Sequence, residues 1–201
     1  MKFNPDVHHR RSIRLKRYDY AQTGAYFVTI LVKDREHLLA EVVDGAVQLS
    51  KAGEIVDECW KEISRHFTEV ECDTYMIMPN HIHGILVVGD VRARHASPLQ
   101  RHPLRVTARP TGPKPSSVGA IIGSFKSAAT KRINRFRRTI GFVVWQRNYY
   151  EHIIRNEDSL NKIREYIIHN PLRWEFDREN IVGKPDGIEQ EFWKVFGQKG
   201  K

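Results

Sequence analysis

Runs of apolar residues predict four core strands in this chain. Residues 26–32, YFVTILV, are aromatic and β-branched without a breaker, which is typical of a buried strand. Residues 71–78, 81–88 and 142–154 contain comparable runs, and the short link after residue 78 makes the first two of these antiparallel neighbours. Residues 38–49 contain an Asp-Gly pair between short strand-like pieces, which predicts a hairpin turn.

Apolar residues at a spacing of three and four predict three helices. The first follows Ser50, an N-cap candidate, and its apolar stripe is formed by Ile55, Val56, Cys59, Trp60, Ile63 and Phe67. The second covers residues 118–136. The third covers residues 158–170 and ends at Pro171, because a residue that precedes proline disfavours the helical region.

The order strand–helix–strand–strand–helix–strand predicts an α+β sandwich: a mainly antiparallel four-stranded sheet with helices on one face. We expect a basic N-terminal arm at residues 1–23, a domain at 24–174, and a C-terminal tail at 175–201 whose aromatic residues pack on that domain. Residues 89–115 contain five prolines and no acid after position 90, which predicts a flexible basic insertion. The insertion is either a contact for nucleic acid or a solvated linker.

The charge balance of 33 Lys+Arg against 24 Asp+Glu, a formal net charge of +9, favours a polyanionic partner. Residues 8–17 carry five basic residues and no acid, so they form either an arm along phosphates or a disordered tail. Residues 145–150 mix aromatic and polar side chains, as base-stacking surfaces do. The candidate DNA contacts are Arg10, Arg11, Arg14, Lys16, Arg17, Lys126, Lys131, Arg132 and Arg147.

Membrane insertion and secretion are not indicated. The chain has no run of eighteen apolar residues, and its N-terminus lacks the apolar centre of a signal peptide. We therefore expect a cytoplasmic bacterial protein associated with the nucleoid. Cys59 and Cys72 have no metal-type spacing, and buried thiols in a reducing compartment are the expected form.

His81 and His83 are the candidate metal ligands. On a strand, residues two apart point to the same face, so both imidazoles converge on one place. Two polar side chains at a solvated sheet edge would give the same pattern. Tyr166 and Asn170 are four apart in the third predicted helix and share a helix face, so they offer a nucleophile and a further ligand.

Several motifs together support the interpretation of His81 and His83 as metal ligands. They are MPNHIHG at 78–84, RRSIRL at 10–15, GAYFVTI at 24–30, IIGSFKS at 121–127, WQRNYYEH at 145–152 and YI-x-x-NP at 166–171. In type and order they resemble the His-hydrophobic-His, single-tyrosine transposases of the IS200-like family, and most closely the REP-associated tyrosine transposases. The resemblance runs from about residue 10 to about residue 174.

This resemblance implies a ferredoxin-like domain that cleaves and rejoins hairpin-containing single-stranded DNA from palindromic repeats. It implies that His81 and His83 bind Mg²⁺ or Mn²⁺ and that Tyr166 is the nucleophile of a 5′-phosphotyrosine intermediate. Asn170 matches the third-ligand position, where many insertion-sequence members have Gln. Tyr149 and Tyr150 are the rival nucleophiles, although neither has a partner four residues further on.

Two other functions stay open. A non-catalytic, sequence-specific DNA-binding protein derived from a transposase would use the same basic and aromatic residues. A metal-dependent phosphodiesterase, in which water attacks, would form no covalent adduct. The family resemblance allows either a monomer or a homodimer, and neither the DNA target sequence nor present-day transposition follows from the residues.

Overall fold

The computed structural model describes residues 22–89 and 116–197 of the chain. The basic N-terminal arm, except for residues 22 and 23, and the insertion, except for residue 89, lie outside the described residues. The same holds for five of the predicted DNA contacts: Arg10, Arg11, Arg14, Lys16 and Arg17. Within the described ranges, every helix is too short or too polar to span a lipid bilayer.

Four strands of the described residues form one antiparallel sheet in the order β4-β5-β1-β6. The strands are β1 (Gly24–Leu31), β4 (Val70–Ile77), β5 (His81–Val88) and β6 (Tyr150–Ile154). With a helix between β1 and β4 and another between β5 and β6, this is the ferredoxin-like order. The predicted α+β class and antiparallel four-stranded sheet are therefore confirmed.

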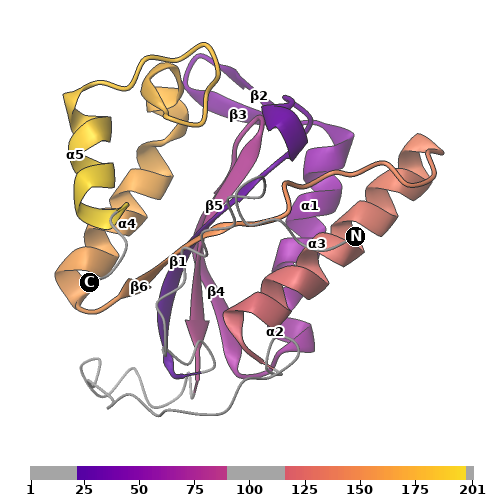
Figure 1. The fold of residues 1–201 in the computed structure, drawn as a ribbon, viewed down its shortest axis with the longest axis horizontal. Coiled ribbons are helices and arrows are strands. Elements are labelled where there is room, and N and C mark those ends of the chain that lie inside the picture. Colours follow the sequence, from indigo (N-terminus) through magenta and orange to yellow (C-terminus); the bar gives the residue numbers. More distant parts are fainter. Residues whose placement is uncertain (1–21, 90–115, 198–201) are drawn as a thin grey trace, which may run out of the picture.

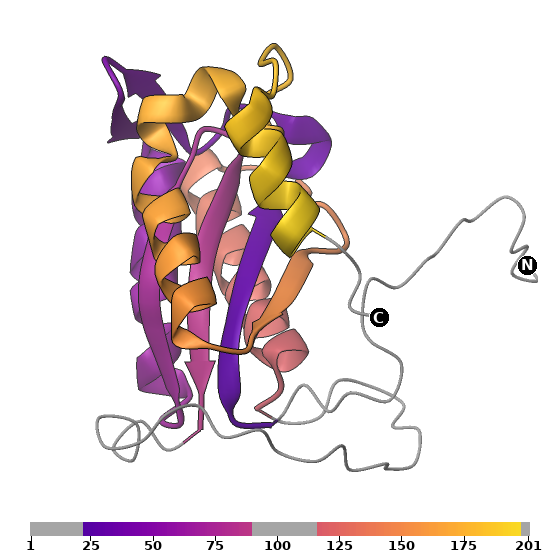
Figure 2. The ribbon, with the colours of Figure 1, turned by 90° about the vertical axis from the view of Figure 1, so that its left-hand side faces the viewer.

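The helices cover both faces of the sheet (Figures 1 and 2). The two crossover helices, α1 (Lys51–Lys61, followed by α2, Ile63–His66) and α3 (Val118–Arg137), share one face, as predicted. The other face is covered by α4 (Glu157–His169), the 3₁₀ helix η3 (Pro171–Phe176) and α5 (Gly187–Phe196). The prediction of helices on one face thus holds for the crossover helices, and α4 and α5 form an additional layer.

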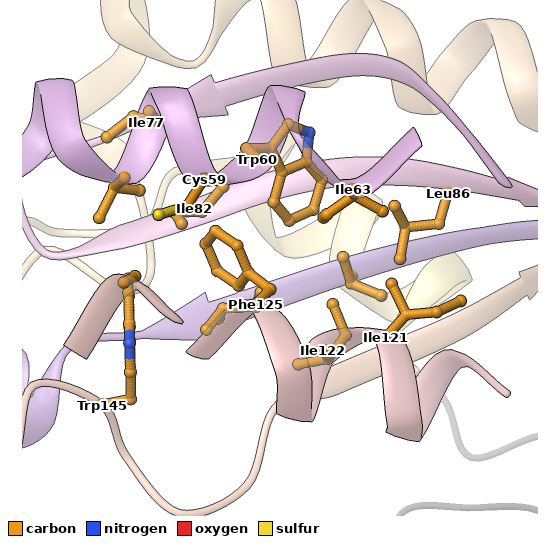
Figure 3. Close-up of a cluster of buried hydrophobic side chains, with 14 of the residues drawn as sticks. Cys59, Trp60, Ile63, Ile77, Ile82, Leu86, Ile121, Ile122, Phe125 and Trp145 are labelled. Carbon is orange, nitrogen blue, oxygen red and sulfur yellow. The ribbon is translucent and has the colours of Figure 1, made fainter. Parts of the chain in front are cut away.

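Alternation along the strands separates two cores. On β1, Tyr26 and Val28 belong to the cluster under α1 and α3, and Phe27 belongs to the cluster under α4 and α5. Figure 3 shows the first cluster, where Trp60 and Phe125 meet between the two crossover helices with ring centroids 5.2 Å apart. Both faces of the sheet are therefore buried, which explains the continuous apolar runs in the sequence.

Local signals place the caps and the hairpin. Ser50 accepts a hydrogen bond from the backbone N–H of Gly53 and caps α1, and Ser117 caps α3 in the same way. The hairpin of β2 (Ala40–Val43) and β3 (Ala46–Leu49) turns at Asp44 and Gly45, whose φ angles are 51° and 74°. The predicted Ser50 cap and the predicted Asp-Gly hairpin are confirmed.

The predicted strand at residues 142–154 was too long, since β6 begins at Tyr150. Before it, the chain makes a single isolated bridge between Val32 and Trp145. Lys126 of α3 lies against this segment, and its Nζ donates to the carbonyl oxygens of Gln146 at 2.5 Å and Asn148 at 3.2 Å. These carbonyl groups thus have a partner outside the sheet, and regular pairing with β1 starts only beyond them, at Tyr150.

Candidate functional site

His81 and His83 lie on β5, an inner strand between β4 and β1. Both side chains point to the α4 side of the sheet and are completely buried. The Nδ1 atom of His81 lies 2.8 Å from Oδ1 of Asn80, and Nδ1 of His83 lies 2.9 Å from the hydroxyl oxygen of Thr29, its cross-strand neighbour. These contacts occupy one nitrogen of each ring and leave Nε2 for another partner.

Asn80 fixes the tautomer of His81. Its Nδ2 donates to the backbone carbonyl oxygens of Glu179 at 2.8 Å and Arg35 at 3.4 Å. Its Oδ1 can only accept, so the contact with His81 requires a proton on Nδ1 of that ring. Burial lowers the pKa of His81 to about 3, which keeps the ring neutral at physiological pH. The Nε2 atom of His81 therefore presents a lone pair.

Asp177, which directly follows η3, adds a carboxylate to the two histidines. Its side chain is completely buried, and its Oδ2 lies 3.8 Å from Nε2 of His81 and 3.8 Å from Nε2 of His83. Burial acts to raise the pKa of Asp177, but the two histidines and Asn170 lower it more, and the net direction is downward. The site thus contains an ionised carboxylate beside two imidazoles.

The chemistry of this donor set fits a divalent cation. In the described part of the chain, Nε2 of His81, Nε2 of His83 and Oδ1 of Asn170 are buried without a hydrogen-bond partner. A lone pair that faces a carboxylate oxygen is unfavourable unless positive charge lies between them. Atoms that ligate one ion at about 2.1 Å lie within roughly 4.2 Å of each other, and the two 3.8 Å distances satisfy this limit.

Asn170 reaches the same place from the end of α4. Its Nδ2 donates a 2.6 Å hydrogen bond to Oδ2 of Asp177. The carboxylate of Asp177, which is not among the predicted site residues, therefore contacts the predicted third ligand and faces both histidines. The signal available for Asp177 was weak: an acidic residue seven positions after Asn170, beyond the helix that Pro171 ends.

Tyr166 projects from α4 next to the histidines, with its ring centroid 5.3 Å from that of His83. Its ring is stacked on Phe192 of α5 at 3.6 Å. Its hydroxyl donates to Oε1 of Glu189 at 3.1 Å and accepts from Nε1 of Trp193 at 3.3 Å. Burial, followed by the carboxylates of Asp177 and Glu189, raises the pKa of Tyr166, so its phenol is protonated at neutral pH.

The rival tyrosines differ from each other. Tyr149 packs against the core under α1 and α3, on the opposite face of the sheet from His83, and its hydroxyl donates to Glu151 at 2.8 Å. Tyr150 lies on the same face as Tyr166, and its hydroxyl donates to the backbone carbonyl oxygen of Phe196. Burial raises the pKa of Tyr150 to about 12. Of the two, Tyr150 is therefore the closer rival.

The four described candidate DNA contacts divide into two pairs. Lys126 is held by backbone carbonyl groups, and Arg132 donates to the carboxylate of Glu62 at 2.6 Å and 3.1 Å. Lys131 and Arg147 line a hollow of about 620 Å³ between α3 and residues 141–147, which Lys126 also borders. The first pair is engaged within the molecule, whereas the side chains of the second pair make no ion pair among the described residues.

A second hollow of about 430 Å³ adjoins the first at Lys131 and extends the groove past the end of α3. Its lining adds Arg135 and Arg138, and no acidic side chain of the described residues lines either hollow. Ile140 and Val143, in the segment that forms the other wall, are largely exposed. The groove is therefore basic along its length and has apolar side chains within reach.

The fold resembles a solved structure described as "Structure of the REP associates tyrosine transposase bound to a REP hairpin". The TM-score is 0.53 at 17% sequence identity, over 80% of this chain and 73% of that one. At this identity the likeness extends to the fold alone. No family model matches the chain.

Fold and site together define an α+β protein with a ferredoxin-like sheet and a buried cluster of two histidines and one aspartate. The chain is 43% identical over 178 residues to a protein of Haemophilus influenzae that is described only as uncharacterized. The match covers 88% of this chain and 96% of the relative. The chain belongs to the same family as that protein.

Proposed function

We propose that this protein is a tyrosine DNA transposase of the IS200-like family, from its REP-associated branch, and acts as a single-strand endonuclease and strand transferase. The observation that carries the proposal is the placement of Tyr166 beside His83, whose Nε2 faces Asp177 without a hydrogen-bond partner in the described residues. A nucleophile next to a cation site is what phosphodiester cleavage through a protein–DNA intermediate requires.

His81, His83 and Asp177 would hold the cation, and Asn170 would either orient Asp177 or join as a ligand through its Oδ1. Imidazole nitrogens with one carboxylate oxygen suit Mn²⁺, and Mg²⁺ is the alternative that favours oxygen ligands. When bound, a divalent cation polarises the scissile phosphate and neutralises charge that develops on it. Thr29 and Asn80 hold the two rings in the orientation that this requires.

Tyr166 would act as the nucleophile. Its phenolic oxygen forms a bond to the 5′-phosphate while the bond to the 3′-oxygen breaks, which leaves a 5′-phosphotyrosine and a free 3′-hydroxyl. The covalent bond to the enzyme conserves the energy of the phosphodiester, so strands can be rejoined without a nucleotide cofactor. The stack of Tyr166 on Phe192 fixes the ring at 3.6 Å and limits the positions of its hydroxyl.

The groove beside α3 would bind the DNA. Lys131 and Arg147 line its first hollow, and Arg135 and Arg138 line the second, so basic residues follow its whole length. Backbone phosphates contact such residues without regard to sequence. Exposed Ile140 and Val143 offer apolar contacts for unpaired bases. The substrate that suits this combination is single-stranded DNA with a short hairpin.

The test is incubation with labelled hairpin-containing single-stranded DNA and Mn²⁺, followed by a denaturing gel. We expect a metal-dependent covalent band that is lost in Tyr166→Phe and kept in Tyr149→Phe. Loss of the band in Tyr150→Phe instead, with Tyr166→Phe active, would move the nucleophile to the closer rival. Cleavage without any covalent band would indicate hydrolysis by water.

The second candidate function is that of a non-catalytic DNA-binding protein. It is favoured by the position of α5 over Tyr166. The Tyr166 hydroxyl is hydrogen-bonded to Glu189 and Trp193 of that helix and is therefore not free to attack DNA in this structure. Such a protein would bind the hairpin without cleavage and would bind equally well after Tyr166→Phe. The denaturing gel and a mobility-shift assay, both run on wild type and on Tyr166→Phe, separate this function from that of a transposase.

A further inference from the structure

Glu189 is a buried carboxylate on the first turn of α5, with 3% of its surface exposed. Its Oε1 accepts hydrogen bonds from the Tyr166 hydroxyl at 3.1 Å, from Nε1 of Trp193 at 2.8 Å and from the backbone N–H of Arg178 at 3.1 Å. Burying a carboxylate costs free energy, which a glutamine at this position would avoid while still accepting these bonds. The presence of an acid therefore calls for a reason beyond packing.

We propose that Glu189 is a catalytic residue that accepts the proton of Tyr166 when the tyrosine attacks DNA, an inference that rests on the proposed function. Oε1 of Glu189 lies within hydrogen-bond distance of the atom that would react. The other polar side chain that contacts the hydroxyl is Trp193, whose ring N–H can only donate. In the described residues, Glu189 is thus the side chain positioned to take this proton.

The surroundings of Glu189 suit proton transfer. Burial, followed by the charge of Asp177, raises the pKa of Glu189, which increases its affinity for a proton. Trp193 donates to both the carboxylate and the phenolic oxygen, so it can stabilise negative charge on either atom during the transfer. Arg178 lies over the ring of Trp193 at 4.3 Å and holds the indole in place.

The O–H bond of Tyr166 breaks, its proton passes to Oε1 of Glu189, and the phenolic oxygen bonds to phosphorus as the 3′-oxygen leaves. The 3′-oxygen takes a proton from water. In rejoining, a 3′-hydroxyl loses its proton to water and attacks phosphorus, and Glu189 returns its proton to the departing phenolic oxygen.

The experiment compares adduct formation by Glu189→Gln and by wild type in single turnover. Glutamine preserves the size of the side chain and its acceptor oxygen, but it cannot take a proton at neutral pH. We expect adduct formation to slow on the order of 10²–10⁴-fold, with unchanged hairpin binding. Glu191→Gln is the matched control, because Glu191 lies on the same helix, is exposed and pairs with Lys194.

A second readout separates proton transfer from a structural role. A fluorinated tyrosine at position 166 has a more acidic phenol, which ionises without a strong base. In the Glu189→Gln background it should restore most of the lost rate, while in wild type it should change the rate little. A slow Glu189→Gln enzyme that the fluorinated residue fails to restore would mean that Glu189 only positions α5, and the inference would be overturned.

The remaining outcomes are distinguishable. If wild type forms the adduct and Glu189→Gln forms it equally fast, the inference is wrong and the proposed function stands. If wild type forms no adduct with the hairpin DNA in Mn²⁺, the proposed function fails and takes the inference with it.

Discussion

Asn170 donates a 2.6 Å hydrogen bond to the carboxylate of Asp177, through the same oxygen that lies 3.8 Å from Nε2 of each buried histidine. One carboxylate oxygen thus faces both imidazoles and accepts from the amide. This arrangement makes Asp177 the stronger candidate for the third ligand. Asn170 then takes the role of a residue that orients and polarises it.

This relationship gives the first prediction, on metal affinity. Asp177→Asn removes the charge and should weaken Mn²⁺ binding more than Asn170→Ala does. We expect Asn170→Ala to lose about 10–100-fold, as removal of an outer hydrogen bond to a ligand does. Titration of Mn²⁺ followed by electron paramagnetic resonance measures both constants without DNA or catalysis. The reverse order of the two losses would identify Asn170 as the ligand.

Residues of this site are predictable from the sequence where they follow a strand or helix period, and they are not predictable where distant contacts place them. His81 and His83 share a strand face because side chains alternate with a period of two, which any reader of the chain can apply. Tyr166 and Asn170 follow from the helix period in the same way. Asp177 has no periodic signal, because it is placed by η3 and by a hydrogen bond from Asn80 to Glu179, 99 residues away in sequence.

The fold, too, has parts that the sequence predicts and one part that it does not. The sheet and the crossover helices are predictable because each carries a continuous or periodic apolar pattern. Residues 142–149 also look like a strand, and Val144 and Trp145 are indeed buried, yet Val143 is 54% exposed and the segment lies outside the ladder. The segment is held by contacts between distant residues, with Lys126 and with the end of β1, which local propensity does not encode.

The second prediction concerns Gly84, which follows His83 on β5. A Cβ at this position would lie 2.4 Å from Cζ2 of Trp60, a ring that is fully buried and cannot retreat. Gly84→Ala should therefore lower the free energy of unfolding by about 1–3 kcal/mol. The matched control is Gly123→Ala in α3, where a Cβ meets nothing within 4 Å and where alanine should add about 0.5–1 kcal/mol.

Urea unfolding at equilibrium measures both glycine variants. Replacing Trp60 by Phe in the Gly84→Ala background removes part of the ring and should recover some of the loss. If Gly84→Ala and Trp60→Phe changed the free energy of unfolding additively, a direct clash between the new Cβ and Trp60 would be contradicted.

The third prediction is a pH dependence of stability at His152 on β6. Burial, followed by the charge of Arg155, lowers the pKa of His152 to about 4, below its ordinary value of 6.5. Between these two values the unfolded chain binds a proton that the folded protein does not, so stability falls as the pH falls from about 6.5 to about 4. His152→Phe, which keeps an aromatic ring against Phe196, should lose less stability over the same range.

Urea midpoints at pH 7, 5.5 and 4.5 measure this dependence. Other groups that titrate in this window act on both proteins, so the difference between wild type and His152→Phe isolates the contribution of His152. We expect that difference to grow by about 1–3 kcal/mol as the pH falls. Parallel curves for the two proteins would mean that His152 keeps an ordinary pKa in the fold.

The fourth prediction separates two lysines of α3, Lys126 and Lys131, which are both predicted DNA contacts. Lys126 donates to the carbonyl oxygens of Gln146 and Asn148, and burial lowers its pKa to about 8. Lys126→Met removes these partly exposed hydrogen bonds and should cost about 0.5–1.5 kcal/mol of unfolding free energy. Lys131, which lines the groove and has no ion pair among the described contacts, should be replaceable by Met at almost no cost.

DNA binding should respond to the same two variants in the opposite way. Loss of one phosphate contact reduces the salt slope of the binding constant by about 0.7 for single-stranded DNA, so Lys131→Met should flatten that slope and weaken binding. Lys126→Met, studied at a temperature where it remains folded, should keep the wild-type slope because its ammonium group is held by the protein backbone. Fluorescence anisotropy of a labelled hairpin strand at several salt concentrations measures both slopes. If Lys126→Met changed the slope and Lys131→Met did not, a DNA phosphate would contact Lys126, which borders the same groove, and Lys131 would not be a phosphate contact.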